Sequence, residues 1–426
     1  MTPQIKQRIE QIRRGEVPEG YKKTKVGIVP EEWEEHKLSH YLTVNNDKNT
    51  DLKYTKDDVF SISGELGIVN QIELLGRSYA GVSVAPYGIV YPNDVVYTKS
   101  PLKANPYGII KTNKLGVTGI VSTLYAIFHC NNNVSPDYVQ LYFESDHNLN
   151  NYLYPIVNIG AKHDMKISDE GSLRGTVVFP PLPEQEKIAE ILQTEDKVIE
   201  LQQKKIDELK RLKKVYLSKM FPKKGCNVPE IRFPGFTAPW EQRKFGDLIK
   251  ETREKTTVEN EDTLLSCAID GMFLNSELFS HFRGSSNIGY LKVKKNDLIL
   301  SAQNLHLGNC NVNLRFEHGI ISPAYKVYEL VNCNSLFMQA WVKQDKTKDF
   351  FLKASTEGAS VCRKNIVWEE LYKQELPVPK MDEQMKIGQY FDNLNNLITL
   401  HQRELEEEQK KKKALMQLLL TGIVRT

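Results

Sequence analysis

The sequence predicts an α+β protein with an internal repeat, in which two globular domains alternate with two long helices. A helical pattern runs from Glu184 to Met220 without an internal Gly or Pro, and apolar residues recur in it at alternating steps of four and three. The pattern returns 199 residues later, where Glu383-Gln384-Met385-Lys386-Ile387 repeats Glu184-Gln185-Glu186-Lys187-Ile188. Two copies at a fixed offset indicate a duplicated chain with pseudo-twofold symmetry.

Composition limits the class of protein. The 426 residues have room for two to four domains, and with a formal net charge of only +3 any basic surface must be local. The sequence has no run of eighteen apolar residues and no hydrophobic signal region at its start. Its six cysteines form no CxxC pair and no metal-ligand spacing. These features predict reduced thiols, no metal site, no membrane partner and a cytoplasmic location.

The first half predicts a short helix, a globular domain and a long helix. Residues 1–16 place Ile5, Ile9 and Ile12 on one face of an amphipathic helix. Residues 17–180 mix short β-rich runs with turn residues, as α+β domains do. The β-rich runs are Val59–Ser63, Gly88–Tyr91, Asp94–Tyr97 and Val117–Phe128, and a helical pattern follows at Asp137–Ser145. The first long helix occupies residues 181–222.

The second half repeats this order, with a globular domain over residues 223–378 and a long helix over residues 379–426. Asn296-Asp297 matches Asn93-Asp94, and Gly319-Ile320-Ile321-Ser322 matches Gly119-Ile120-Val121-Ser122. The domain interiors differ more than their frames, as expected for two binding modules with different ligands. Gly388 is expected to weaken the start of the second long helix.

Each long helix carries an apolar seam that must be buried. A helix from Glu184 to Met220 rises about 55 Å, so an antiparallel coiled-coil pair of the two copies would hold the globular domains a fixed distance apart. Polar seam residues such as Glu195 and Gln202 cost stability but can fix the register. The residues predicted to form this helix pair and subunit interface are Ile188, Leu192, Ile199, Ile206, Leu209, Tyr216, Ile387, Phe391, Ile398, Leu405, Leu415 and Leu419.

The sequence shows no catalytic motif: P-loop, HExxH and GxSxG patterns are all missing. Asn105-Pro106-Tyr107-Gly108 faintly resembles the Asn-Pro-Pro-aromatic motif with which adenine methyltransferases hold the flipped base, but it lacks the second proline and no glycine-rich cofactor loop precedes it. A turn is the better interpretation. The pairs His163-Asp164 and Asp169-Glu170 have no second constellation to support acid–base chemistry. We therefore expect a binding protein without catalytic residues.

Basic and amide side chains gather in the loops of both globular domains. Arg and Lys can pair with guanine, and Asn and Gln with adenine, in the major groove of double-stranded DNA. In the first domain these residues are Lys99, Lys103, Lys162, His163, Lys166 and Arg174, with Lys111 and Lys114 near them. In the second domain they are Arg283, Gln303, Asn304, His306, Lys353, Arg363 and Lys364. Two such sets in equivalent regions predict a DNA interface.

These features together resemble the specificity subunits of type I restriction–modification systems, over essentially the whole chain. The resemblance rests on the run from Lys25 to Trp33 (KVGIVPEEW), on the run from Pro180 to Ile188, on its second copy at Glu383–Ile387 and on the two long helices. It implies two target recognition domains, over residues 17–180 and 223–378, each reading one half of a split DNA site. The helices would set the spacer and dock two modification subunits.

The resemblance also implies that catalysis belongs to partner subunits. S-adenosylmethionine, ATP and Mg²⁺ would be used by the modification and restriction subunits, and this chain would need no cofactor. Two other classes stay open. A DNA methyltransferase with a cryptic site would bind S-adenosylmethionine on its own, and a coiled-coil adaptor would bind proteins without sequence-specific DNA binding.

Overall fold

The computed structural model describes residues 2–102, 105–159, 165–279, 286–356 and 364–426. They form two compact units, each described here by itself: unit 1 comprises Met1–Glu200 and Glu406–Thr426, and unit 2 comprises Leu201–Leu405. The two long helices, α6 (Leu182–Lys219) and α11 (Met381–Leu420), each contribute one part to each unit. The compact units therefore cut through the predicted helical segments, 181–222 and 379–426, instead of following their ends.

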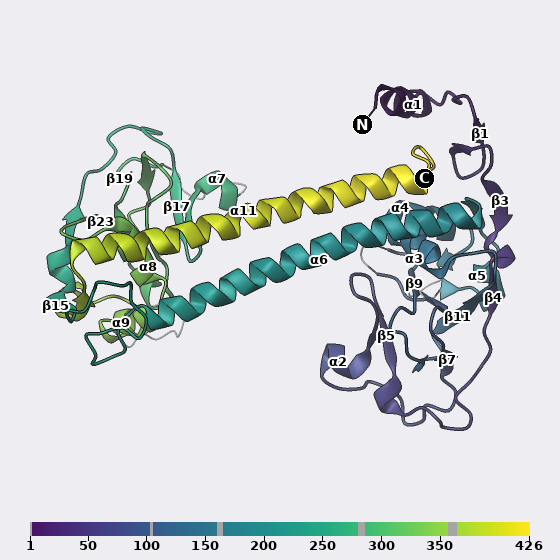
Figure 1. The fold of residues 1–426 in the computed structure, drawn as a ribbon, viewed down its shortest axis with the longest axis horizontal. Coiled ribbons are helices and arrows are strands. Elements are labelled where there is room, and N and C mark those ends of the chain that lie inside the picture. The colour runs from purple at the N-terminus through teal and green to yellow at the C-terminus, as the bar shows by residue number, and fades with distance from the viewer. Residues whose placement is uncertain (1, 103–104, 160–164, 280–285, 357–363) are drawn as a thin grey trace. The chain divides into compact units, whose positions relative to one another are not determined.

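Unit 1 is built on a four-stranded antiparallel sheet with both faces covered (Figure 1). In spatial order its strands are β4 (Leu42–Val44), β11 (Tyr125–Cys130), β8 (Val95–Thr98) and β9 (Ile109–Thr112). One face buries Tyr97 and Phe128 with α3 (Pro136–Glu144), α4 (Asp146–Leu153) and the start of α6. The other face buries Val96 and Ile127 with two strand pairs: β5 (Phe60–Ser63) with β6 (Gly67–Asn70), and β7 (Gly88–Val90) with β10 (Gly119–Val121).

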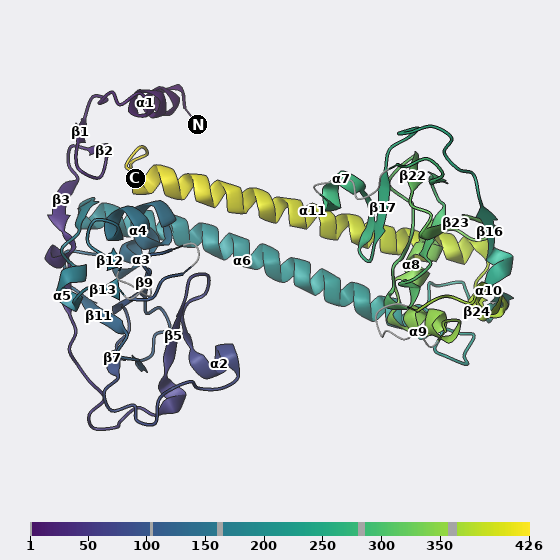
Figure 2. The same ribbon diagram turned by 180° about the vertical axis from the view of Figure 1, so that it is seen from behind.

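Unit 2 contains a four-stranded antiparallel sheet of the same kind (Figure 2). In spatial order its strands are β16 (Ile249–Thr252), β23 (Tyr325–Leu330), β20 (Leu298–Ser301) and β21 (Cys310–Val312). One face buries Leu300 and Tyr328 with α8 (Ser335–Val342), α9 (Asp345–Lys353) and the start of α11. The other face buries Ile299 and Val327 with two strand pairs: β17 (Leu265–Ala268) with β18 (Gly271–Leu274), and β19 (Leu291–Lys294) with β22 (His318–Ile321).

A two-stranded pair precedes each long helix. β3 (Glu34–Lys37) pairs with β14 (Thr176–Phe179) before α6, and β15 (Glu241–Lys244) pairs with β24 (Glu375–Val378) before α11. The remaining elements of unit 1 are α1 (Pro3–Arg13), β1 (Tyr21–Lys23), β2 (Ile28–Pro30), η1 (Leu38–His40), η2 (Lys56–Asp58), α2 (Gln71–Leu75), β12 (Asn158–Ile159), β13 (Met165–Lys166) and α5 (Asp169–Ser172). Those of unit 2 are η4 (Phe245–Leu248), α7 (Asn275–Leu278), η5 (Leu305–Leu307) and α10 (Trp368–Lys373).

One prediction about these elements was wrong. The run predicted at Val117–Phe128 forms two strands, because the chain turns where the Tyr125 N–H donates to the Ser122 carbonyl at 3.2 Å. The second long helix begins at Met381 and runs without a break through Gly388. A Cβ atom at position 388 would lie 2.6 Å from the Cβ of Leu336 and 2.7 Å from the backbone nitrogen of Phe337. Glycine therefore lets α8 pack closely on α11.

Candidate nucleic-acid interface

In unit 1 the Glu-Gln pair at the start of α6 fixes this helix to the sheet domain. Gln185 Oε1 accepts the backbone N–H of Ser135, the N-cap of α3, at 2.9 Å, and Gln185 Nε2 donates to the Pro180 carbonyl at 2.9 Å. The buried Glu184 accepts from Trp33 Nε1 at 3.2 Å and from Arg425 at 2.6 and 2.9 Å. These bonds fix the start of α6 against α3, beside the sheet that carries the candidate loops.

In unit 2 the second Glu-Gln pair makes matching bonds. Gln384 Oε1 accepts the backbone N–H of Asn334, the N-cap of α8, at 2.8 Å, and Gln384 Nε2 donates to the Pro379 carbonyl at 2.9 Å. Glu383, 1% exposed, receives two hydrogen bonds from Arg232 at 2.6 and 2.8 Å. The repeated motif is thus a structural clamp, and we call each set a helix clamp.

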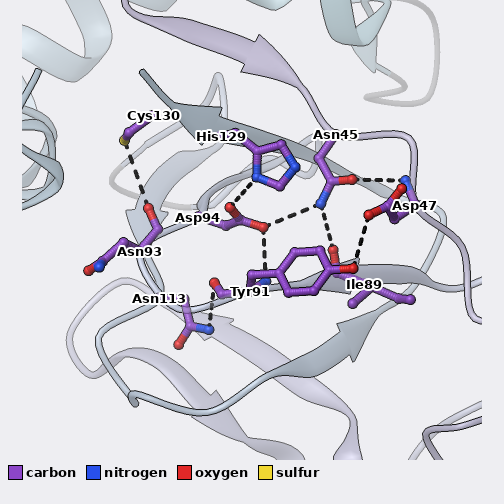
Figure 3. A network of polar contacts seen from close by, with 9 residues as sticks. All are labelled: Asn45, Asp47, Ile89, Tyr91, Asn93, Asp94, Asn113, His129 and Cys130. Carbon is purple, nitrogen blue, oxygen red and sulfur yellow. Dashed lines mark hydrogen bonds and ion pairs between the residues drawn. The ribbon is translucent and has the colours of Figure 1, made fainter. Parts of the chain in front are cut away.

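A buried aspartate organises the turn between β7 and β8 in unit 1 (Figure 3). Asp94 Oδ2 accepts from the Tyr91 N–H at 2.9 Å and from Asn45 Nδ2 at 3.3 Å, while Oδ1 lies 2.6 Å from His129 Nδ1. Asn93 before it has a φ of 70°, which Asn tolerates better than most residues. Burial raises the pKa of Asp94, and the contact with His129 opposes that rise.

In the corresponding turn of unit 2, Asp297 also accepts a backbone N–H, but a different side chain lies near its carboxylate. Asp297 Oδ2 accepts from the Lys294 N–H at 2.7 Å, and Asn296 has a φ of 73°. Burial raises the pKa of Asp297 to about 6, and the negative charge of Glu329 contributes to the rise. Glu329 precedes the end of β23, as His129 precedes the end of β11.

The structure brings together several predicted DNA-binding residues of unit 2. Gln303, Asn304 and His306 lie in the loop between β20 and β21, and the Lys364 N–H donates to the Gln303 carbonyl at 3.2 Å. Lys353 ends α9, which packs against η5 of the same loop. Lys353 and Gln303 are exposed, and Lys364 and Asn304 are half-buried. Both His306 ring nitrogens are buried without a hydrogen-bond partner among the described residues.

The predicted basic residues of unit 1 have more varied surroundings. Lys99 forms an ion pair with Asp169, so its charge is already neutralised. Lys111 is buried in β9, where burial lowers its pKa, and Lys114 pairs with Asp137 at 2.6 Å. Arg174 is exposed and lines a cavity of about 880 Å³ whose other basic residues are Arg13, Lys25 and His147. Among the unit 1 candidates that the structure describes, Arg174 is therefore the best placed to contact an anionic ligand.

Five of the predicted DNA-binding residues lie outside the described residues, and these are Lys103, Lys162, His163, Arg283 and Arg363. Lys166 is the last residue of strand β13.

The segment Asn105-Pro106-Tyr107-Gly108 forms a turn, as predicted, with the Gly108 N–H donating to the Asn105 carbonyl at 3.1 Å. Asp169 pairs with Lys99, which gives it a structural role. Within the described ranges no cluster of His, Cys, Asp and Glu is arranged to hold a metal ion. Five cysteines are free thiols, and no helix in the described part of the chain is long and apolar enough to cross a membrane.

The predicted seam residues are withdrawn from solvent to different degrees. Four are half-buried, and these are Ile199, Leu209, Tyr216 and Leu415. The other eight are buried, and these are Ile188, Leu192, Ile206, Ile387, Phe391, Ile398, Leu405 and Leu419.

Comparison with solved structures identifies the fold as that of type I restriction–modification subunits. A chain from a structure of complex assembly and conformational transition in a type I R-M system matches with a TM-score of 0.53 at 14% identity, over 93% of this chain and 99% of that chain. The type I S subunit from M. genitalium matches with a TM-score of 0.51 at 12% identity, over 91% and 96%.

Two curated relatives are both named as specificity subunits of type I restriction enzymes. The chain is 23% identical over 436 residues to the MjaX type I restriction enzyme specificity subunit of Methanocaldococcus jannaschii, covering 96% of this chain and 97% of the relative. It is 26% identical over 273 residues to the MjaVIII specificity subunit of that organism, covering 58% and 62%. No family model matches the chain. The two relatives confirm the predicted resemblance to type I specificity subunits.

Sequence reasoning missed the arginines of the helix clamps, Arg232 and Arg425. Arg425 lies 241 residues from Glu184, and no spacing signal connects residues so distant. A signal was nevertheless present in the repeat. Each arginine follows an aliphatic residue in the segment after a long helix, as Ile231-Arg232 and Val424-Arg425.

Proposed function

We propose that this chain is the DNA sequence-recognition subunit of a type I restriction–modification complex. The observation that carries the proposal is a common frame with different loops. The two sheets have the same strand order and the same helix clamp, whereas the loops after β8 and β20 present different side chains. Two domains with the same fold and different loops are suited to recognising two different half-sites of DNA. The names of the curated relatives agree with this role.

Each unit would read one half of a bipartite site in the major groove. In unit 2 the exposed Gln303 offers an amide that can pair with adenine, and Lys353 and Lys364 offer ammonium groups for guanine or phosphate. In unit 1 the exposed Arg174 offers a guanidinium group. Because these groups differ in kind, the two half-sites should differ in sequence.

The long helices would form an antiparallel pair that sets the spacer between half-sites. In unit 1, Lys412 near the end of α11 pairs with Asp196 of α6 at 2.5 Å. In unit 2, Gln202 of α6 donates to the His401 carbonyl at 3.3 Å and to Glu404 Oε2 at 2.7 Å. Unit 1 contains the start of α6 and the end of α11, and unit 2 contains the end of α6 and the start of α11, as expected for opposite helix directions.

This geometry makes the spacer testable. Seven extra residues in each helix add roughly 10 Å, which should lengthen the spacer by about three base pairs at roughly 3.4 Å each. The half-sites should stay unchanged because neither sheet domain is touched. Methylation-site mapping measures both quantities, and an unchanged spacer would show that the helices do not set it.

Catalysis would belong to the partner subunits: methyl transfer from S-adenosylmethionine to two modification subunits, and ATP- and Mg²⁺-dependent cleavage to restriction subunits. The test is reconstitution. The purified chain should neither methylate nor cut DNA, and it should direct methylation to one bipartite sequence once modification subunits are added. Methylation by the lone chain would overturn the proposal.

A further inference from the structure

One seam lysine has no counter-ion among the described residues of unit 2, although its counterpart in unit 1 has one. Lys213 and Lys412 occupy equivalent seam positions, 199 residues apart. Lys412 pairs with Asp196 at 2.5 Å. The residue equivalent to Asp196 in the second helix is Asn395. Asn395 and Lys213 line the same cavity, so unit 2 has an amide at the position where unit 1 has the acid.

A second lysine of unit 2 replaces an acid of unit 1. Gln140 and Gln339 are equivalent, because their Oε1 atoms accept the N–H of Thr112 at 2.6 Å and of Val312 at 2.7 Å. Four residues later unit 1 has Glu144 and unit 2 has Lys343. Lys343 Nζ donates to the carbonyls of Ile269 at 2.6 Å and Cys310 at 3.0 Å, which uses two of its three N–H groups.

Lys213 and Lys343 line one cavity of about 610 Å³ within unit 2. Its walls come from α6, the turn between β17 and β18, α8 and α11. Both lysines are half-buried, and burial lowers the pKa of each. The positive charge of Lys343 lowers the pKa of Lys213 further.

The acids of this cavity do not neutralise the pair. Asp345 forms its ion pair with Lys348 at 3.3 Å, and Asp392 accepts from Asn396 at 3.2 Å. Asp270 raises the pKa of both lysines, but as the smallest influence on each. Across the described residues, no carboxylate forms an ion pair with Lys213 or Lys343. The cavity thus holds two partly desolvated cations, an arrangement that is unfavourable unless an anion joins them.

We propose that this cavity binds a phosphate group, supplied either by the DNA backbone or as the free ion. A phosphate group presents several acceptor oxygens and negative charge, which match the remaining N–H groups of the two lysines. Asn395 and Gln402 line the same cavity and add amide donors. Unit 1 provides no such pair, because Lys412 is paired with Asp196. The site goes beyond sequence recognition, and free phosphate tests it without any DNA.

The decisive variant is Asn395→Asp, which supplies the acid that unit 1 already has. It should fold normally, because it restores an ion pair that the other copy of the seam uses. In calorimetric titration of the full chain with inorganic phosphate at constant ionic strength, the variant should bind roughly tenfold or more weakly than the wild type. Lys213→Gln should do the same, and Lys205→Gln, an exposed lysine of the same helix, should not.

A DNA-binding experiment identifies the source of the phosphate. DNA affinity is measured in phosphate-free buffer at several salt concentrations. If a backbone phosphate occupies the site, the slope of log affinity against log salt concentration should be smaller for Asn395→Asp than for the wild type, by about one released ion. An unchanged slope with weaker phosphate binding would identify the free ion as the ligand. Equal phosphate titrations and equal slopes for wild type and Asn395→Asp would overturn the proposal. That result would leave site-directed methylation, and with it the proposed function, untouched.

Discussion

Unit 1 and unit 2 fix their long helices with the same bonds but surround their sheets with different charges. Gln185 and Gln384 bond to the same two kinds of backbone group at nearly equal distances. Asp94 and Asp297 accept the same backbone N–H in their turns. The side chains opposite these aspartates, however, are His129 in one unit and Glu329 in the other.

The comparison shows which kinds of contact the two units share. A bond to a backbone group does not depend on the identity of the partner residue, so it tolerates sequence divergence. A bond between two side chains is lost when either residue changes. The ion pair of Lys411 and Glu195 at 3.1 Å illustrates this, because the equivalent residues are Leu212 and Leu394. Backbone contacts and the Glu–Arg pairs of the helix clamps thus preserve the frame, while other side-chain pairs diverge.

Breaking one helix clamp should give the largest effect. Glu383→Ala leaves the guanidinium of Arg232, 13% exposed, without its partner, so unfolding stability should fall by about 3–5 kcal/mol. Asp382→Ala, at the exposed neighbouring position, should change stability by less than about 0.5 kcal/mol. Urea denaturation of both variants measures the difference. Equal stabilities would mean that the clamp does not hold unit 2 together.

Gly388 of α11 and the equivalent residue of α6 give a second comparison of how the two units pack their long helices. Gly388→Ala should cost about 1–3 kcal/mol through its clash with α8, although alanine favours helices by about 1 kcal/mol. The equivalent residue of the first helix is already Ala189, which is buried in unit 1. A stabilised Gly388→Ala protein in thermal unfolding would show that α8 can move away without cost.

A smaller effect should appear in the pH dependence of stability. The pKa of Asp297 is raised to about 6 in the folded protein, against about 4 in an unfolded chain. Its contribution to stability is therefore fully present below about pH 4 and is lost as the pH rises through 6, by about 3 kcal/mol. Asp297→Asn should remove this loss and flatten the stability profile between pH 4 and 7.

The matched control for this experiment is Asp94→Asn in unit 1. Burial also raises the pKa of Asp94, but His129 opposes the rise, so this variant should flatten the profile less. Urea denaturation at pH 4.5 and 7.5 compares the two. An Asp297→Asn protein with the wild-type pH dependence would contradict the assignment.

Much of the frame was predictable because it depends on periodic patterns. Helix α6 begins within one residue and ends within three residues of the predicted segment 181–222, since its apolar seam and proline start are local signals. The turns with Asn93 and Asn296 also appeared as a repeated motif. The close packing at Gly388 was not predictable, because it depends on Leu336 and Phe337 of another helix.

The candidate interface was harder to predict because charge alone does not indicate exposure. Lys111 looked like a surface lysine, yet it is buried in β9. Lys99 looked available for DNA, yet it pairs with Asp169. In both cases a partner or a covering element distant in the sequence decides the role. Gln303 and Arg174 are exposed, and their DNA-binding role stays a prediction.

Exchange of one reader tests the central claim most directly. Residues 240–378 would be replaced by the equivalent domain of a related specificity subunit, and the complex with modification subunits would be mapped by methylation-site sequencing. We expect one half-site to change, while the other half-site and the spacer remain as in the wild type. A change in both half-sites, or in neither, would contradict the account of two independent readers on a common frame.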